Sequence, residues 1–176
     1  MKKYVCILRG INVGGRNKVL KDDLIEMFEG LNYKFVNTYI QSGNIGFSAP
    51  ESKFISDLEI EIQLAIVDWF DLGVPVIVRS QKEMEQIIAN KPFDTEENVH
   101  LTFLKKEPTA LELEGIKKYN FPPDEYKISG KEVYIKCGDR YSQTKLNNQF
   151  FERYLKVSAT TRNWKTVKKL SQLSGN

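Results

Sequence analysis

The sequence predicts an α+β protein made of two ferredoxin-like halves packed together, each with the element order βαββαβ, plus a C-terminal helix. In the first 80 residues, short apolar runs alternate with segments whose apolar residues recur every three or four positions. After residue 90 the same order of elements returns, with no detectable repeat of the sequence itself. We therefore expect one half at residues 1–90 and a second half at residues 91–176, which includes the C-terminal helix.

The first half needs six elements, and each is marked by its apolar spacing. Ser42 and Gly43 form a tight-turn signal between two strands, and Gly30 and Gly73 end the two helices. The expected elements are a strand at 4–9, a helix at 20–31, strands at 35–41 and 44–48, a helix at 54–69 and a strand at 74–79.

A connector and the second half follow. Ser80 with Glu83 three residues later is a capping box that starts a helix, and residues 90–98 form a polar link. Thr160 or Thr161 is expected to cap the C-terminal helix. The elements expected after the link are a strand at 99–105, a helix at 111–116, strands at 126–129 and 132–137, a helix at 146–155, a strand at 157–160 and a helix from 164.

Both faces of the first strand are apolar. Tyr4, Cys6 and Leu8 point one way, and Val5 and Ile7 point the other way. A strand that is apolar on both sides is covered on both sides. This argues against an open RNA-recognition sheet, which displays exposed aromatic residues on its central strands.

Composition excludes several classes of protein. No apolar run approaches the roughly 18 residues of a membrane span, and the N-terminus lacks the features of a signal peptide, so we expect a cytoplasmic protein that does not bind membranes. Cys6 and Cys137 are expected to be reduced and buried. Because His100 is the single histidine, the sequence offers neither a zinc site of ordinary spacing nor a good Ser-His-Asp triad.

The charge is distributed unevenly, although the net charge is only +3. Residues 1–20 and 153–176 contain no acid, so the middle of the chain carries a charge of −8. If the two ends meet, they form one basic face suited to an anionic partner; otherwise they are two separate solvated surfaces. The basic residues of the two ends are Lys2, Lys3, Arg9, Arg16, Lys18, Arg153, Lys156, Arg162, Lys165, Lys168 and Lys169.

The loop at residues 10–18 follows the first strand and combines glycines with cationic side chains. Glycine allows sharp turns and leaves backbone N–H groups accessible, which favours an anion beside Arg16 and Lys18. Gly10 and Gly15 have the spacing of a P-loop, but Arg16 and Asn17 stand where lysine and a hydroxyl residue are required. A nucleotide-hydrolysing P-loop is therefore not indicated.

Topology predicts which polar residues join this loop. The first two strands of a βαββαβ unit run parallel, so the loop and the turn at residues 41–44 lie at the same end of the sheet. This groups Asn12 and Arg16 with Gln41, Ser42 and Asn44. The alternative is that residues 42–44 are simply a good hairpin turn.

A third polar cluster lies at residues 160–166. Arg162 and Lys165 stand near the expected start of the last helix, where the dipole disfavours cations, and a bound anion would resolve that conflict. Alternatively, Arg162 pairs with a carboxylate and Trp164 is ordinary core. We expect residues 160–164 to approach the loop at residues 10–18 and complete one anion site.

These motifs resemble the signature of a widespread bacterial family that contains a domain of unknown function. The matching stretches are LRGINVGG at 8–15, NKV at 17–19, YIQSGN at 39–44 and ATTRNW at 159–164. The resemblance implies a duplicated ferredoxin-like arrangement in a bacterial protein. It does not indicate which activity the protein has. Lys165 departs from the pattern, in which asparagine is common.

The sequence favours a protein that binds a phosphate-bearing ligand, either a nucleotide-like small molecule or a nucleic acid. The alternatives are an enzyme acting on a small phosphorylated or carboxylated substrate in the same pocket, and a structural adaptor for an acidic protein. No catalytic residue, cofactor or oligomeric state is indicated. The candidate ligand-binding residues are Arg9, Asn12, Gly14, Gly15, Arg16, Lys18, Gln41, Ser42, Asn44, Thr161, Arg162 and Asn163.

Overall fold

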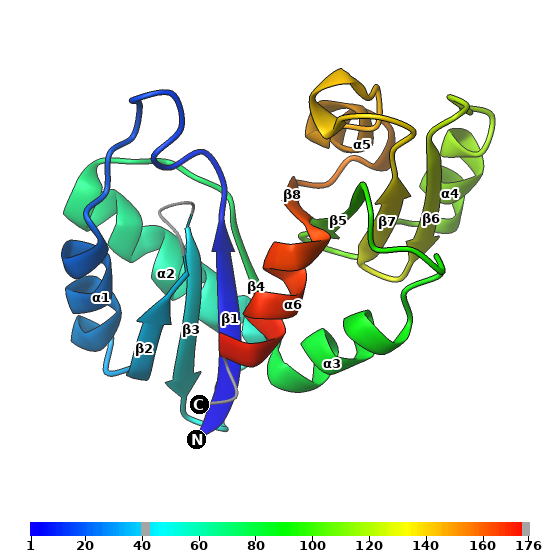
Figure 1. Ribbon diagram of the computed structural model, residues 1–176. Coiled ribbons are helices and arrows are strands. Elements are labelled where there is room, and N and C mark those ends of the chain that lie inside the picture. The colour runs from blue at the N-terminus through cyan, green and yellow to red at the C-terminus, as the bar shows by residue number, and fades with distance from the viewer. Residues whose placement is uncertain (40–42, 174–176) are drawn as a thin grey trace. The chain divides into compact units, whose positions relative to one another are not determined.

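The computed structural model describes residues 1–39 and 43–173 (Figure 1). It divides into two compact units. Unit 1 comprises Met1–Ile88 and the C-terminal residues from Lys168, and unit 2 comprises Ala89–Val167. The sequence assigns the whole C-terminal helix to the second half, whereas in the structure its later part belongs to unit 1.

Unit 1 contains a four-stranded antiparallel sheet in the order β2-β3-β1-β4. This is the ferredoxin-like order, in which each helix connects two strands that flank a third. The elements are β1 (Lys2–Leu8), α1 (Lys21–Gly30), β2 (Lys34–Thr38), β3 (Asn44–Ala49), α2 (Ile55–Phe70) and β4 (Val76–Ser80).

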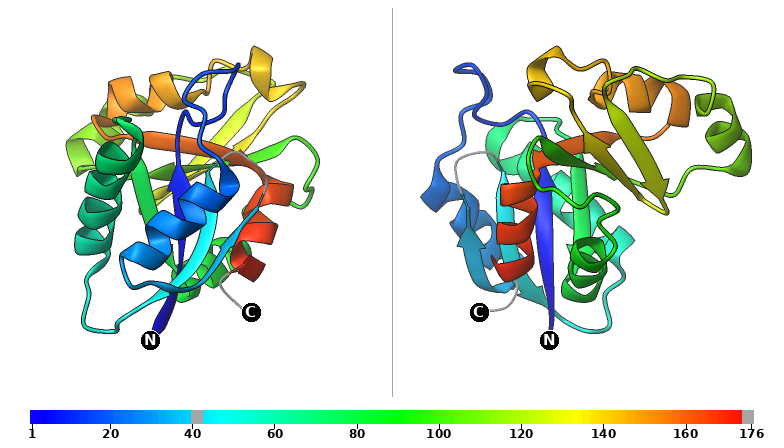
Figure 2. Two further views of the ribbon diagram at one scale, coloured as in Figure 1. Left: turned by 90° about the vertical axis from the view of Figure 1, so that its left-hand side faces the viewer. Right: turned by 45° about the vertical axis from the view of Figure 1, so that its right-hand side comes forward.

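One face of this sheet packs against α1 and α2, which lie side by side on it (Figure 2). Tyr4, Cys6 and Leu8 of β1 point into this core, as their alternation predicts. Phe28 of α1 and Phe47 of β3 add aromatic contacts, with ring centroids 5.3 Å apart. Burial of this apolar face is the main stabilising term for unit 1.

The opposite face of the sheet is also buried. Val5 and Ile7 are fully buried, which confirms the expectation of a sheet covered on both sides. The end of α6 (Trp164–Leu173) approaches β3 at Gly46, where an added Cβ would lie 2.9 Å from the Leu173 carbonyl oxygen. The helix can pack this closely only because Gly46 has no side chain.

The capping box predicted after β4 is confirmed. The Ser80 N–H donates to Glu83 Oε2 at 2.8 Å, and the Glu83 N–H donates to Ser80 Oγ at 3.3 Å. These reciprocal bonds start α3 (Gln81–Ala89).

Unit 2 repeats the same topology. Its sheet has the order β6-β7-β5-β8, and every pairing in it is antiparallel. The two units together confirm the predicted α+β fold of two ferredoxin-like halves. The elements are β5 (Val99–Leu104), α4 (Ala110–Ile116), β6 (Glu125–Ser129), β7 (Glu132–Lys136), a 3₁₀ helix (Tyr141–Gln143), α5 (Asn148–Leu155) and β8 (Ala159–Asn163).

The expected cap of the last helix is wrong. Thr160 and Thr161 are not caps but part of β8, where Thr161 pairs with Thr102 of β5. The cap is Asn163, whose Oδ1 accepts from the Thr166 N–H at 2.8 Å. Consecutive β-branched residues favour the strand, and asparagine is among the best capping residues.

Candidate functional site

The glycine-rich loop (residues 10–18) leaves the end of β1 beside the start of β3. The Leu8 N–H donates to the Gly43 carbonyl at 2.8 Å, and the Arg9 N–H donates to the Pro75 carbonyl at 3.3 Å. Three connections therefore meet at one end of the unit 1 sheet, as the parallel crossover predicts. Gln41 and Ser42, two of the expected site residues, lie outside the described residues.

The glycine-rich loop forms a narrow hairpin that extends beyond the end of the sheet (Figure 1). The Asn12 N–H donates to the Asn17 carbonyl, and the Arg16 N–H donates to the Val13 carbonyl, both at 3.0 Å. Gly14 and Gly15 form its tip with φ values of 57° and 75°. Two successive positive φ angles define a type I′ turn, which requires residues such as glycine.

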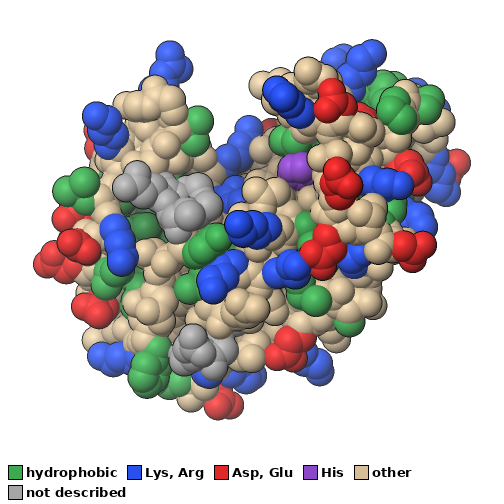
Figure 3. Space-filling view, viewed as in Figure 1, with side chains coloured by type: hydrophobic (Ala, Val, Ile, Leu, Met, Phe, Trp, Pro, Cys, Tyr) green, Lys and Arg blue, Asp and Glu red, His purple; other side chains and the backbone are tan. Residues whose placement is uncertain are grey.

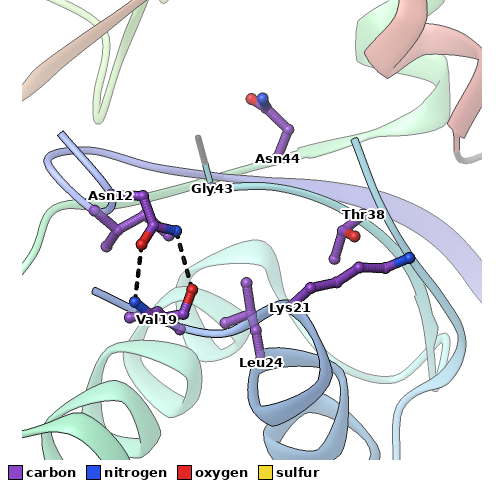
Figure 4. A pocket seen from close by; sticks show the side chains of 8 residues that line it. Asn12, Val19, Lys21, Leu24, Thr38, Gly43 and Asn44 are labelled. Carbon is purple, nitrogen blue, oxygen red and sulfur yellow. Dashed lines mark hydrogen bonds between the residues drawn. The ribbon is translucent and has the colours of Figure 1, made fainter. Parts of the chain in front are cut away.

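Asn12 holds the base of this hairpin. Its Nδ2 donates to the Val19 carbonyl at 3.0 Å, and its Oδ1 accepts from the Val19 N–H at 2.9 Å (Figure 4). Both ends of the amide are therefore used to close the loop. Asn12 therefore positions the loop, and its contact with a ligand stays a prediction.

Arg16 and Lys18 extend from the hairpin into solvent. Neither forms an ion pair with any described residue. Figure 3 shows Lys and Arg side chains projecting over this part of unit 1. Arg9, at the base of the loop, is half-buried. The loop thus offers exposed positive charge without a compensating acid.

A pocket of about 180 Å³ lies at the base of the glycine-rich loop (Figure 4). Ile11, Val19 and Leu24 give it apolar walls, and Lys21 and Thr38 add polar groups. Asn44 also borders the pocket, but its fully buried side chain lies on the far side of the strand and donates to the Tyr39 carbonyl at 3.1 Å. Asn44 therefore links the start of β3 to Tyr39, the residue after β2.

A second hollow of about 300 Å³ adjoins this pocket, and Asn12, Val19 and Lys21 line both. Gly15, Lys18 and Leu20 complete its walls. The first hollow is lined by one lysine, Lys21, and the second by two, Lys18 and Lys21. Lys21 stands at the boundary and forms no ion pair with the described residues.

The third expected motif belongs to unit 2, where its residues have local partners. Thr161 Oγ1 lies 2.7 Å from both Thr102 Oγ1 and Asn148 Oδ1. Arg162 Nη1 donates to the Thr161 carbonyl at 3.0 Å. The glycine-rich loop is in unit 1, so a single site that joins these motifs stays a prediction.

A polar row on the sheet of unit 2 was not predicted from the sequence. The His100 ring stacks on Tyr141 with centroids 4.6 Å apart, and burial lowers the pKa of His100. Thr102, two residues further along β5, continues the row through Thr161 to Asn148. The alternation of His100 and Thr102 between apolar residues is the signal that could have revealed it.

Comparison with known proteins places the chain in a family. A family model described as "Protein of unknown function (DUF1697)" matches residues 1–134. The chain belongs to the DUF1697 family. The match includes the glycine-rich loop and ends before the ATTRNW motif at 159–164.

A solved structure supports the fold of this DUF1697 chain. It is similar to that of the conserved bacterial protein SP0830 from Streptococcus pneumoniae, with a TM-score of 0.75 and 23% identity over 98% of each chain. At this identity the likeness shows the fold alone. No curated protein matches the chain.

Two further observations bear on the chemistry of the DUF1697 chain. Within residues 1–39 and 43–173, no three His, Cys, Asp or Glu side chains are grouped to hold a metal ion. In the same part of the chain, no helix has the length and apolarity needed to cross a membrane. Unit 1 offers the two hollows and the exposed cations of the glycine-rich loop as features for a site, and unit 2 has a separate hollow of about 300 Å³ beside Asp124 and Arg140.

Proposed function

We propose that unit 1 binds a small molecule that carries a phosphate next to an apolar group, as a nucleotide does. One observation carries this proposal: a hollow with the apolar side chains of Ile11 and Leu24 adjoins a second hollow that Lys18 lines, and Lys21 lines both. A ligand with an apolar end and an anionic end fits both at once. Binding sites commonly combine apolar walls with a few polar groups that fix orientation.

Each part of the site has a task in this proposal. The apolar end of the ligand packs against Ile11, Val19 and Leu24, and the phosphate lies near Lys18 and Lys21. Arg16, on the same hairpin, adds charge that attracts the ligand at a distance. Asp22 and Asp23, in the first turn of α1, line neither hollow.

A calorimetric titration tests the proposal. Nucleoside monophosphates, the matching nucleosides, sugar phosphates, inorganic phosphate and a short oligonucleotide are titrated separately into the full chain. We expect the nucleoside monophosphates to bind more tightly than either the nucleoside or phosphate alone, because each of those fills one hollow.

Charge removal then locates the site. Lys18→Ala and Lys21→Ala should each weaken binding about tenfold, since a charge-assisted hydrogen bond contributes about 1.5–3 kcal/mol. Lys34→Ala is the matched control, because Lys34 is an exposed lysine at the opposite end of the same sheet. Equal losses in all three variants, or no binding of any phosphorylated probe at millimolar concentration, would contradict the proposal. Tighter binding of the oligonucleotide would assign the site to nucleic acid instead.

A further inference from the structure

Helix α2 has a second apolar surface besides the one in the core. Leu58, Ile62 and Ile66 are buried against the sheet. On the other side, Ile60, Leu64 and Val67 form an apolar stripe at i, i+4 and i+7, with exposed fractions of 57%, 60% and 43%. These three residues share one helix face. An ordinary surface helix presents polar residues there.

Acidic side chains lie along one flank of the apolar stripe. Asp57, Glu61 and Asp68 follow each other at helical spacing beside it, and Asp71 ends the helix. Glu61 is bonded to Lys53, but Asp57, Asp68 and Asp71 form no ion pair with any described residue. Residues 54–78 contain five acids and no base, so nothing in α2 itself neutralises this flank.

A second copy of the chain is a poor occupant of this surface. If two α2 helices packed antiparallel through their apolar stripes, the acidic flank of each would face that of the other. Like charges brought together at an interface oppose association. The charge pattern instead requires a partner that is apolar in the middle and basic at the edge.

We propose that the apolar stripe of α2 binds an amphipathic helix of a partner protein whose polar face is basic. The partner's apolar residues cover Ile60, Leu64 and Val67, and its lysines or arginines lie beside Asp57 and Asp68. This is the helix-on-groove mode of recognition, in which residues three and four apart act as anchors. The surface is distinct from the hollows at the glycine-rich loop, which include no residue of α2.

Fluorescence polarisation with designed peptides tests this proposal. The probe is a labelled helical peptide of leucine and lysine at amphipathic spacing, with the 16-residue length of α2. The comparison peptides are its leucine–glutamate counterpart and a scrambled leucine–lysine sequence. We expect the amphipathic basic peptide to bind at least about tenfold more tightly than either, with an affinity that falls as salt is added.

Variants show whether the apolar stripe is the binding surface. Leu64→Ser should weaken binding about tenfold, because burying a leucine side chain is worth about 1.5–3 kcal/mol. Asp57→Asn with Asp68→Asn should reduce both the affinity and its salt dependence. The control is Leu111→Ser, since Leu111 is an exposed leucine of α4 in unit 2. Circular dichroism confirms that each variant is folded.

The outcomes separate cleanly. The proposal is overturned if the acidic and basic peptides bind alike, if the basic peptide does not bind, or if Leu111→Ser weakens binding as much as Leu64→Ser. Concentration-dependent dimerisation that Leu64→Ser abolishes would instead assign the stripe to a second copy of the chain. Lys18→Ala should leave peptide binding unchanged, so failure at one surface is distinguishable from failure at the other.

Discussion

Gly43 and Gly10 have similar backbone angles in very different surroundings. Their φ values are +73° and +80°, a backbone conformation that residues with a side chain rarely adopt. A Cβ on Gly43 would lie 2.7 Å from Leu8 Cβ and 3.1 Å from Ile11, whereas a Cβ on Gly10 would have no neighbour within 4 Å. A side chain at Gly43 would therefore meet both an unfavourable backbone angle and close neighbours, whereas one at Gly10 would meet the unfavourable backbone angle alone.

We expect Gly43→Ala to destabilise the protein more than Gly10→Ala. Both variants incur roughly 1–2 kcal/mol for the left-handed backbone. Gly43→Ala adds about 1–3 kcal/mol for overpacking against Leu8 and Ile11. Urea denaturation of the two variants and the wild type measures the difference. If the two variants lost the same free energy of unfolding, Leu8 and Ile11 would have to move aside at no cost.

At the scale of single residues, the Cys137 thiol shows how burial suppresses the ionisation of a side chain. Burial and the nearby Asp124 charge raise the pKa of Cys137 to about 11, although a hydrogen bond with Thr144 opposes them. At pH 8 only about one thiol in a thousand is then ionised, and the thiolate is the reactive form.

Cys137 should therefore be inert to a disulfide reagent in the folded protein. In the Cys6→Ala variant, Cys137 is the one remaining thiol. A chromogenic disulfide reagent releases a coloured thiolate when it reacts with a protein thiol, so absorbance follows the reaction of Cys137. We expect very slow reaction under native conditions and complete, rapid reaction in guanidinium chloride. Rapid native reaction at pH 8 would show that the thiol is accessible and more acidic than its surroundings imply.

At the scale of elements, a half-buried polar cluster ties Tyr33, the residue before β2, and Lys53, which precedes α2, to Glu61 of α2. The Tyr33 hydroxyl donates to Glu61 Oε2 at 2.5 Å, and Lys53 Nζ donates to Glu61 Oε1 at 2.6 Å. Burial tends to raise the pKa of Glu61, but the hydrogen bonds from Lys53 and Tyr33 and the Lys53 charge together lower it below its ordinary value.

This cluster gives unit 1 a defined response to acid. The folded-state pKa of Glu61 lies below its unfolded value of about 4.3. Ionised Glu61 therefore adds to the free energy of unfolding above that pH, and this stabilisation is lost as the pH falls through the folded-state pKa. We expect Glu61→Gln to lower the free energy of unfolding by about 1 kcal/mol at pH 7, and the difference from wild type to shrink below about pH 4. Glu26→Gln, which changes an exposed glutamate of α1, should show neither effect. A constant difference from pH 7 to pH 3 would contradict the assignment.

Most elements could be predicted from the sequence because their apolar spacing is regular. The order and pairing of both sheets follow from the βαββαβ order and the crossover rule. The task of Asn12 could not be predicted, because its two bonds to Val19 depend on the hairpin closing. The cap at Asn163 was missed because Thr160 and Thr161 are acceptable caps whose pairing with β5 overrides that preference.

At the scale of the whole molecule, the chain forms most of unit 1 first, then all of unit 2, and its last residues belong to unit 1 again. The residues after Val167 belong to unit 1, where Leu170 is fully buried and the end of α6 approaches Gly46. Unit 1 is therefore made of two separate stretches of chain, and unit 2 of one. The duplicated topology predicts two such units, but the spacing of residues does not reveal that the last helix is divided between them.

We expect a chain that ends at Val167 to be weakened chiefly in unit 1. Losing a buried leucine alone costs about 2–5 kcal/mol, and Leu170→Ala in the full chain should reproduce part of the effect. Hydrogen exchange followed by mass spectrometry resolves the two units. Amides of β1 and β3 should exchange faster, while those of β5 and β7 keep their protection. Equal loss of protection in both units would argue against this assignment.

The return of the chain to unit 1 also sets an order for folding during synthesis. Proteins made of several domains generally fold from the N-terminus as the ribosome extends the chain. Here the first unit to emerge is the last to be completed, because its remaining segment is translated only after all of unit 2. A chain that ends before residue 168 contains all of unit 2 but an incomplete unit 1, which lacks the buried Leu170 and the end of α6 that packs at Gly46.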